Sequence, residues 1–447
     1  MSTGRRVWSF ATALVLVLAA CSLDSGGSTP VPNGDASAGA SAGASAGAAP
    51  VATTGPIKIW YSNNAEEVAW ATAVVDAWNK DHPDELVTGE EIPAGKSSEE
   101  VIGASITAGN TPCLIFNTAP AAVPQFQKQG GLVALDEFPD AAAYIAERTG
   151  DRADQYKFTD GKFYQMPWKT NPVMIFYNKD VFSAAGIATD APPLRTYEEF
   201  LATSKTLVEK GGVEAAIWPS PTSEFFQPWF DYYPLLIAQT GGKGLIEDGE
   251  PQFTTPDGLA VAEFWREMYE QKLAPSEPYN GDSFADKKAA MAIVGPWAIA
   301  VYGDKVDWGA VPVPTRDGMD AKDTHTFSDE KSIGMYVSCE NRGTAWELLK
   351  FATSPENDGA LLEATGQMPM RTDLVGAYPD YFAAHPEYEA FADQASRTVE
   401  VPIVPNSIEV WQTFRTAYGE AVIFGKTPIE QAFTDAATEI KAAIGGG

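Results

Sequence analysis

The stretch IKIWYSNNAEEVAWATAVVDAWNK, residues 57–80, joins a strand pattern to a helix pattern. Its first five residues alternate and are rich in β-branched and aromatic types, which favours a strand, and residues 66–80 repeat apolar side chains at helical spacing. We expect further strands near residue 86 and at 114–116, with helices at 98–108 and 121–129. Strands that alternate with helices predict an α/β fold with a parallel-rich sheet and helices on both faces. In such sheets ligands bind at the carboxyl ends of the strands.

The same organisation continues along the chain. The stretch GKFYQMPWKTNPVMIFYNKDVF, residues 161–182, contains two strand-like runs joined by the polar residues 169–172, which predicts either a hairpin or a crossover between lobes. The patterns also predict helices at 197–209, 256–272, 407–424 and 428–444, a strand, turn and helix at 290–302, and a strand at 333–338.

The first 55 residues predict export and a tether. Arg5 and Arg6 precede an apolar stretch at 8–20 that is too short to span a bilayer, which is typical of a signal peptide at residues 1–20. Cys21 follows Leu-Ala-Ala and resembles the acylated cysteine of bacterial lipoproteins. The alternative is an ordinary secretory signal, and the sequence leaves Sec or Tat export open. Residues 21–55 are dominated by Gly, Ala, Ser, Thr and Pro, which predicts a lipidated flexible linker.

Composition then limits the function of the body that follows. Its length suits two lobes of ordinary domain size. A net charge of -29 argues against nucleic acid and against adsorption to an anionic membrane surface. The three histidines show no metal-site spacing, so we expect no metal and no cofactor. With Cys21 assigned to the lipid, Cys113 and Cys339 remain as a pair in an oxidising compartment, which suggests a disulfide.

Seven motifs in order resemble those of one family, the extracellular solute-binding protein family 1 of bacterial ABC transporters, which includes maltose-binding protein. They lie at 104–114, 130–136, 161–182, 288–297, 345–355, 366–373 and 401–440. The resemblance implies an α/β, two-lobed periplasmic-binding-protein-like fold of type II with three crossovers, near Thr170, Ser328 and Arg371. It divides the body into an N-terminal lobe (56–170 plus 329–370) and a C-terminal lobe (171–328 plus 371–447). It also implies that Cys113 and Cys339 lie at the same edge of neighbouring antiparallel strands.

A sugar offers an apolar face and a ring of hydroxyls, so its site needs aromatic rings and planar polar groups. Trp229, Trp297 and Trp411 match aromatic positions at which family members stack on sugar, although core packing is the ordinary role of a tryptophan. Five further tryptophans fall in strand or helix patterns and are predicted to lie in the core: Trp60, Trp70, Trp78, Trp265 and Trp346.

Polar candidates follow predicted strands or lie at the crossovers, where asparagines also have ordinary roles in turns. They are Asn63, Asn64, Asn117, Thr118, Asn171, Asp329 and Glu330. Gln227 is a further candidate because it lies near Trp229 in the sequence. Asp329 and Glu330 stand where many relatives have a Gly-Gly pair, which predicts either acceptors for sugar hydroxyls or a solvated turn. Residues 117–121 lack the tryptophan and charged pair of maltose-binding protein, so maltose itself is not assigned.

The resulting prediction is a substrate-binding lipoprotein of an ABC sugar importer. It would bind a mono- or oligosaccharide between its lobes, with a malto-oligosaccharide or another glucoside as the first candidate. It would be a monomer without catalytic residues, anchored by lipid to the outer face of the cell membrane, with the ABC permease as partner. The alternatives are an extracellular glycoside hydrolase, since 60 carboxylates could supply a catalytic pair by chance, and a binding protein for a non-sugar solute.

Overall fold

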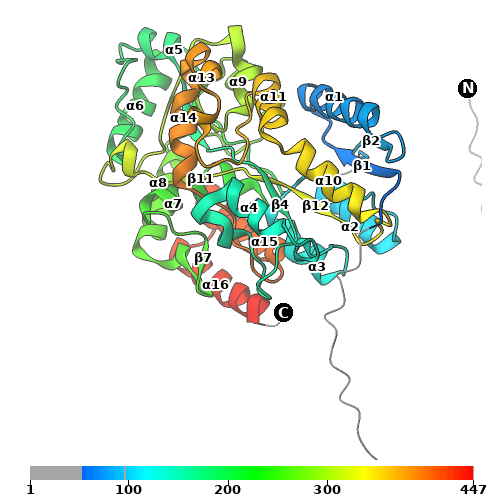
Figure 1. Cartoon of the computed structure of the whole chain (residues 1–447). Helices are drawn as coiled ribbons and strands as arrows, with labels where there is room; N and C mark the ends of the chain where they lie inside the picture. The colour runs from blue at the N-terminus through cyan, green and yellow to red at the C-terminus, as the bar shows by residue number, and fades with distance from the viewer. Residues whose placement is uncertain (1–52, 95–96, 446–447) are drawn as a thin grey trace, which may run out of the picture. The chain divides into compact units, whose positions relative to one another are not determined.

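The computed structural model describes residues 53–94 and 97–445, which form an α/β body with two main sheets (Figure 1). The predicted signal peptide, Cys21 and the linker before residue 53 lie outside the described residues. Within the described part of the chain, no helix has the length and apolar character needed to cross a membrane.

The first sheet has five strands in the order β2-β1-β3-β12-β4. They are β1 (Ile57–Tyr61), β2 (Val87–Glu91), β3 (Leu114–Thr118), β4 (Met166–Lys169) and β12 (Lys331–Met335). β1 pairs in parallel with β2 and β3, whereas β12 is antiparallel to both β3 and β4. A strand from late in the chain therefore completes a sheet begun by the first 170 residues.

The second sheet has four strands in the order β10-β5-β9-β6. They are β5 (Met174–Asn178), β6 (Ala215–Ile217), β9 (Ala289–Val294) and β10 (Trp308–Val311). β5 is antiparallel to β9 and β10, and β6 is parallel to β9. Two short ladders complete the set: β11 (Thr326–Phe327) with β13 (Thr398–Val399), and β7 (Ile246–Glu247) with β8 (Glu250–Pro251).

Helices fill the rest of the body. The longer ones are α1 (Ala65–Asp81), α2 (Ser98–Ala108), α4 (Ala141–Thr149), α6 (Tyr197–Lys210), α7 (Tyr232–Gln239), α8 (Pro256–Glu270), α10 (Arg342–Ala352), α11 (Pro355–Thr365), α15 (Ser407–Tyr418) and α16 (Ile429–Gly445). Short ones are α3 (Val123–Lys128), α5 (Lys179–Ala184), α9 (Trp297–Tyr302), α12 (Leu374–Ala377), α13 (Pro379–Ala384) and α14 (Glu389–Gln394). Short 3₁₀ helices include η1 (Pro120–Ala122), η3 (Gly150–Tyr156) and η4 (Gln227–Phe230), and a π-helical turn at Gly419–Ile423 follows α15.

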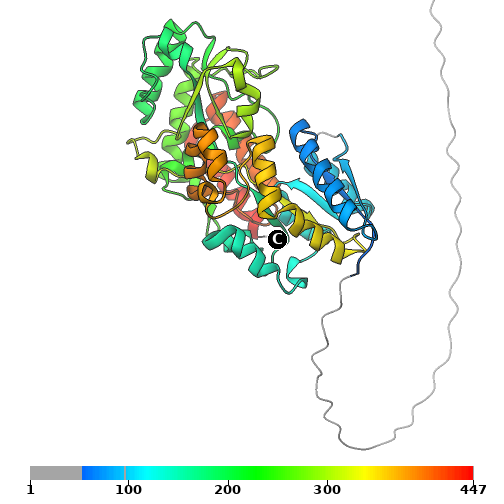
Figure 2. The ribbon, with the colours of Figure 1, turned by 45° about the horizontal axis from the view of Figure 1, so that its top comes forward.

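Each main sheet has its own hydrophobic core. Residues of α1, α10 and α11 pack on the first sheet, and both ribbon views show α10 and α11 beside α1 although they lie far apart in the sequence (Figures 1 and 2). The second sheet packs against α6, α7, α8, α15 and α16. Trp70, Trp78, Trp265 and Trp346 are at most 4 % exposed, which confirms their predicted core role, whereas Trp60 is half-buried.

Two sequence expectations change in the structure. The sheets are mixed and not parallel-rich, because β12 and β5 run against their neighbours; periodicity within one strand carries no information about the direction of the strand beside it. The stretch 161–182 is a crossover and not a hairpin, because β4 belongs to the first sheet and β5 to the second.

Three stretches of chain pass side by side between the two sheets, and we call them the junction: residues 168–172, 328–331 and 367–371. The amide of Thr170 donates to Met368 O (2.8 Å), the amide of Met370 donates to Trp168 O (2.7 Å), and the amide of Asp329 donates to Asn171 O (3.0 Å). Backbone hydrogen bonds therefore tie each stretch to another one.

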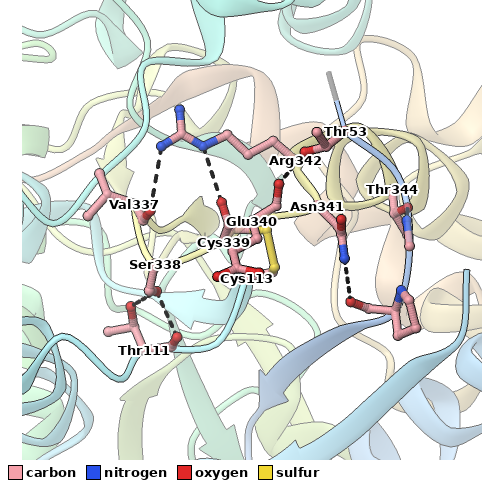
Figure 3. Close-up of a disulfide and its surroundings, with 12 residues drawn as sticks. Thr53, Thr111, Cys113, Val337, Ser338, Cys339, Glu340, Asn341, Arg342 and Thr344 are labelled. Atoms are coloured by element: carbon pink, nitrogen blue, oxygen red, sulfur yellow. Dashed lines mark hydrogen bonds between the residues drawn. A yellow bond between two sulfur atoms is a disulfide. The ribbon is translucent and has the colours of Figure 1, made fainter. Parts of the chain in front are cut away.

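A disulfide joins Cys113, just before β3, to Cys339, a few residues after β12 (Figure 3). Beside it, the Ser338 hydroxyl donates to Thr111 O (2.7 Å), and the Asn341 amide donates to Pro56 O (2.9 Å). The covalent bond holds the late strand β12 in the sheet formed by β1 and β3. It lies at the edge where β1 and β3 begin, away from their carboxyl ends.

Candidate functional site: an aromatic pocket beside a polar junction

A pocket of about 330 Å³ opens at the carboxyl ends of β6 and β9. Its aromatic lining consists of Trp218, Phe230, Trp297 and Tyr302, with Ile217 and the end of β9 as its floor. Trp218, Phe230 and Trp297 are all half-buried, so each ring keeps part of its surface free. This is the position at which α/β sheets bind ligands.

Local chain geometry explains why these rings meet. Trp218 directly follows β6, and Trp297 begins α9 just after β9, so two adjacent parallel strands deliver them to the same edge. Gly295 is required in the turn, since a Cβ there would lie 2.0 Å from the Trp297 ring. The Phe230 ring meets Trp297 edge to face, with centroids 6.1 Å apart.

Polar groups surround the aromatic lining. The Asp282 carboxylate accepts from the amides of Phe284 (3.0 Å) and Ala285 (2.9 Å), and the Ser220 hydroxyl accepts from the amide of Tyr279 (3.2 Å). Both residues line the pocket, as does Ser283. The pocket thus combines apolar walls with a few fixed polar groups, which is the usual composition of a small-molecule site.

A second aromatic cluster lies deeper, around Trp229 and Trp411. Their rings are 5.6 Å apart in a T-shaped pair, and Tyr233 contacts Trp411 at 4.8 Å. Trp229 is 4 % exposed and Trp411 is fully buried. The indole nitrogens of both residues and Oε1 of Gln227 are buried without a hydrogen-bond partner. Three polar atoms of one neighbourhood therefore keep unused hydrogen-bonding capacity, which is uncommon in a protein interior.

The junction contains a buried ionic network on its first-sheet side. Lys169 Nζ donates to Glu67 Oε2 (3.0 Å) and to Asn117 Oδ1 (2.6 Å), while Asn117 and Gln367 donate their amide N–H groups to Glu67. Burial alone would raise the pKa of Glu67, but Lys169 and the two amides outweigh burial and hold that pKa below its ordinary value. Burial lowers the pKa of Lys169, and Glu67 offsets part of that effect.

The structure divides the residues predicted from the sequence into groups. Trp297 lines the open pocket, Gln227, Trp229 and Trp411 belong to the deeper cluster, and Asn117 joins the network of Glu67 and Lys169. Asn171 lies in the junction, where its side chain donates to Asp329 O (3.3 Å) and accepts from the Met368 amide (3.3 Å). Thr118 is buried and donates to Ile115 O (3.3 Å).

Several of these placements differ from what the sequence suggested. Asn64 caps the N-terminus of α1 by accepting from the Glu67 amide (3.0 Å), and Asn63 is exposed beside it. Asp329 pairs with Lys331. These roles satisfy the backbone and the local charges of their own segments.

Two expectations need direct correction. Glu330 is neither in a solvated turn nor in the aromatic pocket: it is 3 % exposed and accepts from the Tyr156 hydroxyl (2.6 Å). Trp411 does not present an open ring face in this structure, because Trp229, Tyr233 and Phe414 enclose it. A role for either residue in ligand binding stays a prediction.

Sequence reasoning also missed residues of the site. Trp218 and Phe230 were not singled out, and neither were Glu67, Lys169 and Gln367. The short strand β6 was not recognised, since it has only three residues; a tryptophan at its carboxyl end would otherwise have been a candidate. The network of Glu67 had no local signal, because its members come from four separate stretches of chain.

These features define a class: α/β binding proteins of the periplasmic-binding-protein type, in which two sheets are joined by several chain passages and a pocket opens at strand ends. The chain belongs to the bacterial extracellular solute-binding protein family, whose model matches residues 73–390. Among the described residues, no group of three His, Cys, Asp or Glu side chains is arranged to hold a metal ion.

Similar proteins include several binding proteins of bacteria. The diacetylchitobiose binding protein DasA of Streptomyces coelicolor is 26 % identical over 359 residues, covering 76 % of this chain and 79 % of that protein. A maltooligosaccharide ABC transporter solute-binding lipoprotein of Streptococcus pneumoniae is 22 % identical over 402 residues, covering 86 % and 90 %. The cyclic alpha-maltosyl-1,6-maltose binding protein of Arthrobacter globiformis has a similar crystal structure, with a TM-score of 0.74, 19 % identity and coverage of 88 % and 100 %.

Proposed function

We propose that this protein is the substrate-binding lipoprotein of an ABC sugar importer, with no catalytic reaction of its own. It binds a mono- or oligosaccharide, with a malto-oligosaccharide or another glucoside as the first candidate, and delivers it to the permease. Family membership supports the binding role, and the ligands printed in the names of its relatives support the sugar class.

The aromatic pocket at the ends of β6 and β9 is the observation that carries the proposal. Trp218, Phe230 and Trp297 offer exposed ring surface on which the C–H face of a sugar can stack. Asp282, Ser220 and Ser283 supply oxygen atoms at the rim, where sugar hydroxyls need partners. Such a combination binds a neutral polyol ring better than it binds a purely apolar or a strongly charged solute.

The proposed mechanism is closure of two lobes around the sugar. The N-terminal lobe comprises residues 56–170 and 329–370, and the C-terminal lobe comprises 171–328 and 371–447. Three chain passages that lie side by side suit a hinge, since a few residues in them can absorb a change of lobe orientation. A sugar that contacts both lobes would shift the population toward the closed state, and the permease would recognise that state.

We place the protein on the outer face of the cell membrane, held by a lipid on Cys21 and otherwise monomeric. The Leu-Ala-Ala-Cys motif, the Gly/Ala/Ser-rich stretch after it and the lipoprotein named among the relatives support this placement. The permease of the importer would be its protein partner. Mass spectrometry of the mature N-terminus tests the anchor directly: an acylated Cys21 is expected, and an unmodified N-terminus would contradict it.

Calorimetric titration of the purified protein with maltose, trehalose, cellobiose, xylobiose and galactose tests the function, with analysis of each sugar afterwards. We expect saturable one-to-one binding of at least one sugar, recovered intact. The Trp297→Ala variant should bind at least tenfold more weakly, because one of the two indole rings that line the pocket is lost. Phe424→Ala is the matched control, since Phe424 is 51 % exposed and does not line the pocket.

The other outcomes separate the alternatives. Cleavage of a sugar would show that the protein is a glycoside hydrolase and not a receptor. Failure to bind any sugar, in a protein whose fold is intact by circular dichroism, would point to a non-sugar solute. Equal affinities of Trp297→Ala and wild type would remove this pocket from the ligand site.

A further inference from the structure

Two glutamates, Glu330 and Glu400, lie close together at the junction. Their surroundings differ from those of Glu67, which pairs with a lysine. Glu330 lies in the second chain passage, and Glu400 directly follows β13. The Tyr156 hydroxyl, from η3, donates to Glu330 Oε2 (2.6 Å). Glu400 Oε1 accepts from the Val401 amide (2.7 Å), whereas its Oε2 is buried without a partner. The two carboxyl groups are close enough for their charges to interact.

No cation neutralises this pair directly. Among the residues that the structure describes, neither Glu330 nor Glu400 has a Lys, Arg or His nitrogen within salt-bridge distance. Lys331 is engaged by Asp329. The Arg152 guanidinium is near enough to attract Glu330, but its own N–H groups donate to Ala395 O (3.0 Å), the Thr398 hydroxyl (3.1 Å) and the Met370 sulfur.

The charged and titratable groups that act on the pair come from several elements. From η3 come Arg152 and Tyr156, and from the second passage come Asp329, Lys331 and Glu330 itself. Glu99 faces Lys331 from α2, and the Tyr233 hydroxyl of α7 donates to the backbone oxygen of Glu400 (2.7 Å). Arg152 and Lys331 attract the two glutamates, while Asp329 repels Glu400, so one full negative charge can be held here more easily than two.

Burial gives the pair an unusual proton affinity. It raises the pKa of Glu330 from 4.5 to about 7, with Arg152 and Tyr156 opposing the rise. Burial and the neighbouring Glu330 raise the pKa of Glu400 well above its ordinary value. Near neutral pH the pair therefore holds at least one proton, and Glu330 loses its proton as the pH rises through about 7.

We propose that Glu330 and Glu400 form a proton-dependent latch, which keeps the junction packed while Glu330 is protonated and loosens it when Glu330 is ionised. The pair joins segments that are far apart in the chain: η3, the second passage and the segment after β13. Separation of the two side chains would hydrate the charge of Glu330, at the expense of the contacts between these segments.

Backbone hydrogen bonds would transmit the effect of pH from the latch to the chain segments that connect the two sheets. Ser328 and Asp329 directly precede Glu330. The Asp329 amide donates to Asn171 O in the first passage, and the Ser328 amide donates to Val399 O, next to Glu400. Movement of Glu330 therefore strains hydrogen bonds to two other segments. If the proposed sugar-binding function holds, which this consequence requires, affinity for the sugar should be higher at mildly acidic pH than at alkaline pH.

Hydrogen exchange of the full protein without any solute tests the latch independently of the sugar. Protection factors, which are corrected for the intrinsic pH dependence of exchange, are measured for the amides of Asp329 and Thr170 between pH 6 and 8. We expect the protection factors to fall about tenfold from pH 6 to pH 8. This ratio follows for a carboxyl whose pKa is about 7 in the packed junction and 4.5 in the opened junction. The amide of Ile57, which bonds to Leu86 O in the first sheet, is the internal control and should keep its protection.

Variants sharpen the same measurement. Glu330→Gln should reduce the tenfold change to less than twofold, whereas Glu209→Gln, which replaces an exposed residue of α6, should leave it as in the wild type. A wild-type junction with equal protection at pH 6 and pH 8 overturns the proposal. So does a tenfold change that survives in Glu330→Gln. Should a variant not fold, the wild-type comparison of Asp329 and Thr170 with Ile57 still decides.

Discussion

Glu67 and Glu330 lie on either side of the same junction, and both are almost inaccessible, at 2 % and 3 % exposed. Burial raises the pKa of each, yet the net shifts have opposite signs. Glu67 meets the ammonium of Lys169 and two side-chain amides, and its pKa is lowered. Burial raises the pKa of Glu330 to about 7, because Arg152, Tyr156 and Glu400 oppose the effect of burial without outweighing it. The balance between burial and the strength of the partners decides whether a buried carboxyl is charged at neutral pH.

The two acids therefore contribute to stability with opposite pH dependence. For Glu67 the folded pKa is lowered, so its contribution is present above the ordinary pKa of 4.5 and is lost as the pH falls through the folded value. For Glu330 the folded pKa is raised, so its contribution is fully present below 4.5 and is lost as the pH rises toward about 7. One side of the junction is weakened by acid and the other side by base.

Removal of the cation should give the largest effect. Lys169→Met leaves the carboxylate of Glu67 buried with amides as its only partners, and the loss of one member of a buried ion pair costs about 3–5 kcal/mol. Urea unfolding at pH 7 should show this loss of unfolding free energy. It should shrink as the pH is lowered, because protonated Glu67 needs no cation. A loss below about 1 kcal/mol would mean that the pair is already neutral.

Removal of the unpaired charge should have the opposite sign. Glu330→Gln should raise the unfolding free energy at pH 8 by up to about 3 kcal/mol, since the wild type bears the cost of ionising a carboxyl whose pKa is raised from 4.5 to about 7. At pH 4.5 the two proteins should be equally stable. Calorimetric melting temperatures across pH 4.5–8 provide the test, and a constant difference at every pH would show a packing effect instead of a charge effect.

A smaller effect should follow loss of one hydrogen bond to Glu67. Gln367→Met keeps most of the side-chain volume but removes the amide that donates to Glu67 Oε2 (3.3 Å), at a cost of about 1–2 kcal/mol. Urea unfolding at pH 7 measures the difference. An unchanged stability would show that Lys169 and Asn117 satisfy the carboxylate without Gln367.

The smallest effect should come from an ion pair at the surface. Lys157 and Asp154 are 2.7 Å apart, with side chains 39 % and 84 % exposed. Water screens such a pair, so Lys157→Met should change the unfolding free energy by less than about 0.5 kcal/mol. The same urea series checks it. A loss of unfolding free energy as large as that of Lys169→Met would contradict the role of burial. The ion pair itself, exposed or buried, would then determine the loss of stability.

Sequence patterns predicted much of the fold and part of the site. The strand at 57–61 and the helices at 98–108, 197–209 and 256–272 lie within about two residues of the observed elements, because apolar periodicity is a local property. Trp297 was found because it ends the family motif at 288–297 and matches an aromatic position of the family, and it does line a pocket. The strand predicted at 333–338 begins at 331 and ends at 335, since its bounds depend on pairing with β3 and β4.

The sequence by itself determined the order of strands and helices, the supply of aromatic rings and the pair of cysteines, because these depend on residue types and on spacing along the chain. Only the tertiary structure decided that Trp411 is enclosed, that β5 runs against β9, and that Glu67 meets a lysine while Glu330 meets a glutamate. The reason is physical: electrostatic and packing interactions depend on groups a few ångströms apart in space, and those groups come from residues far apart in the chain.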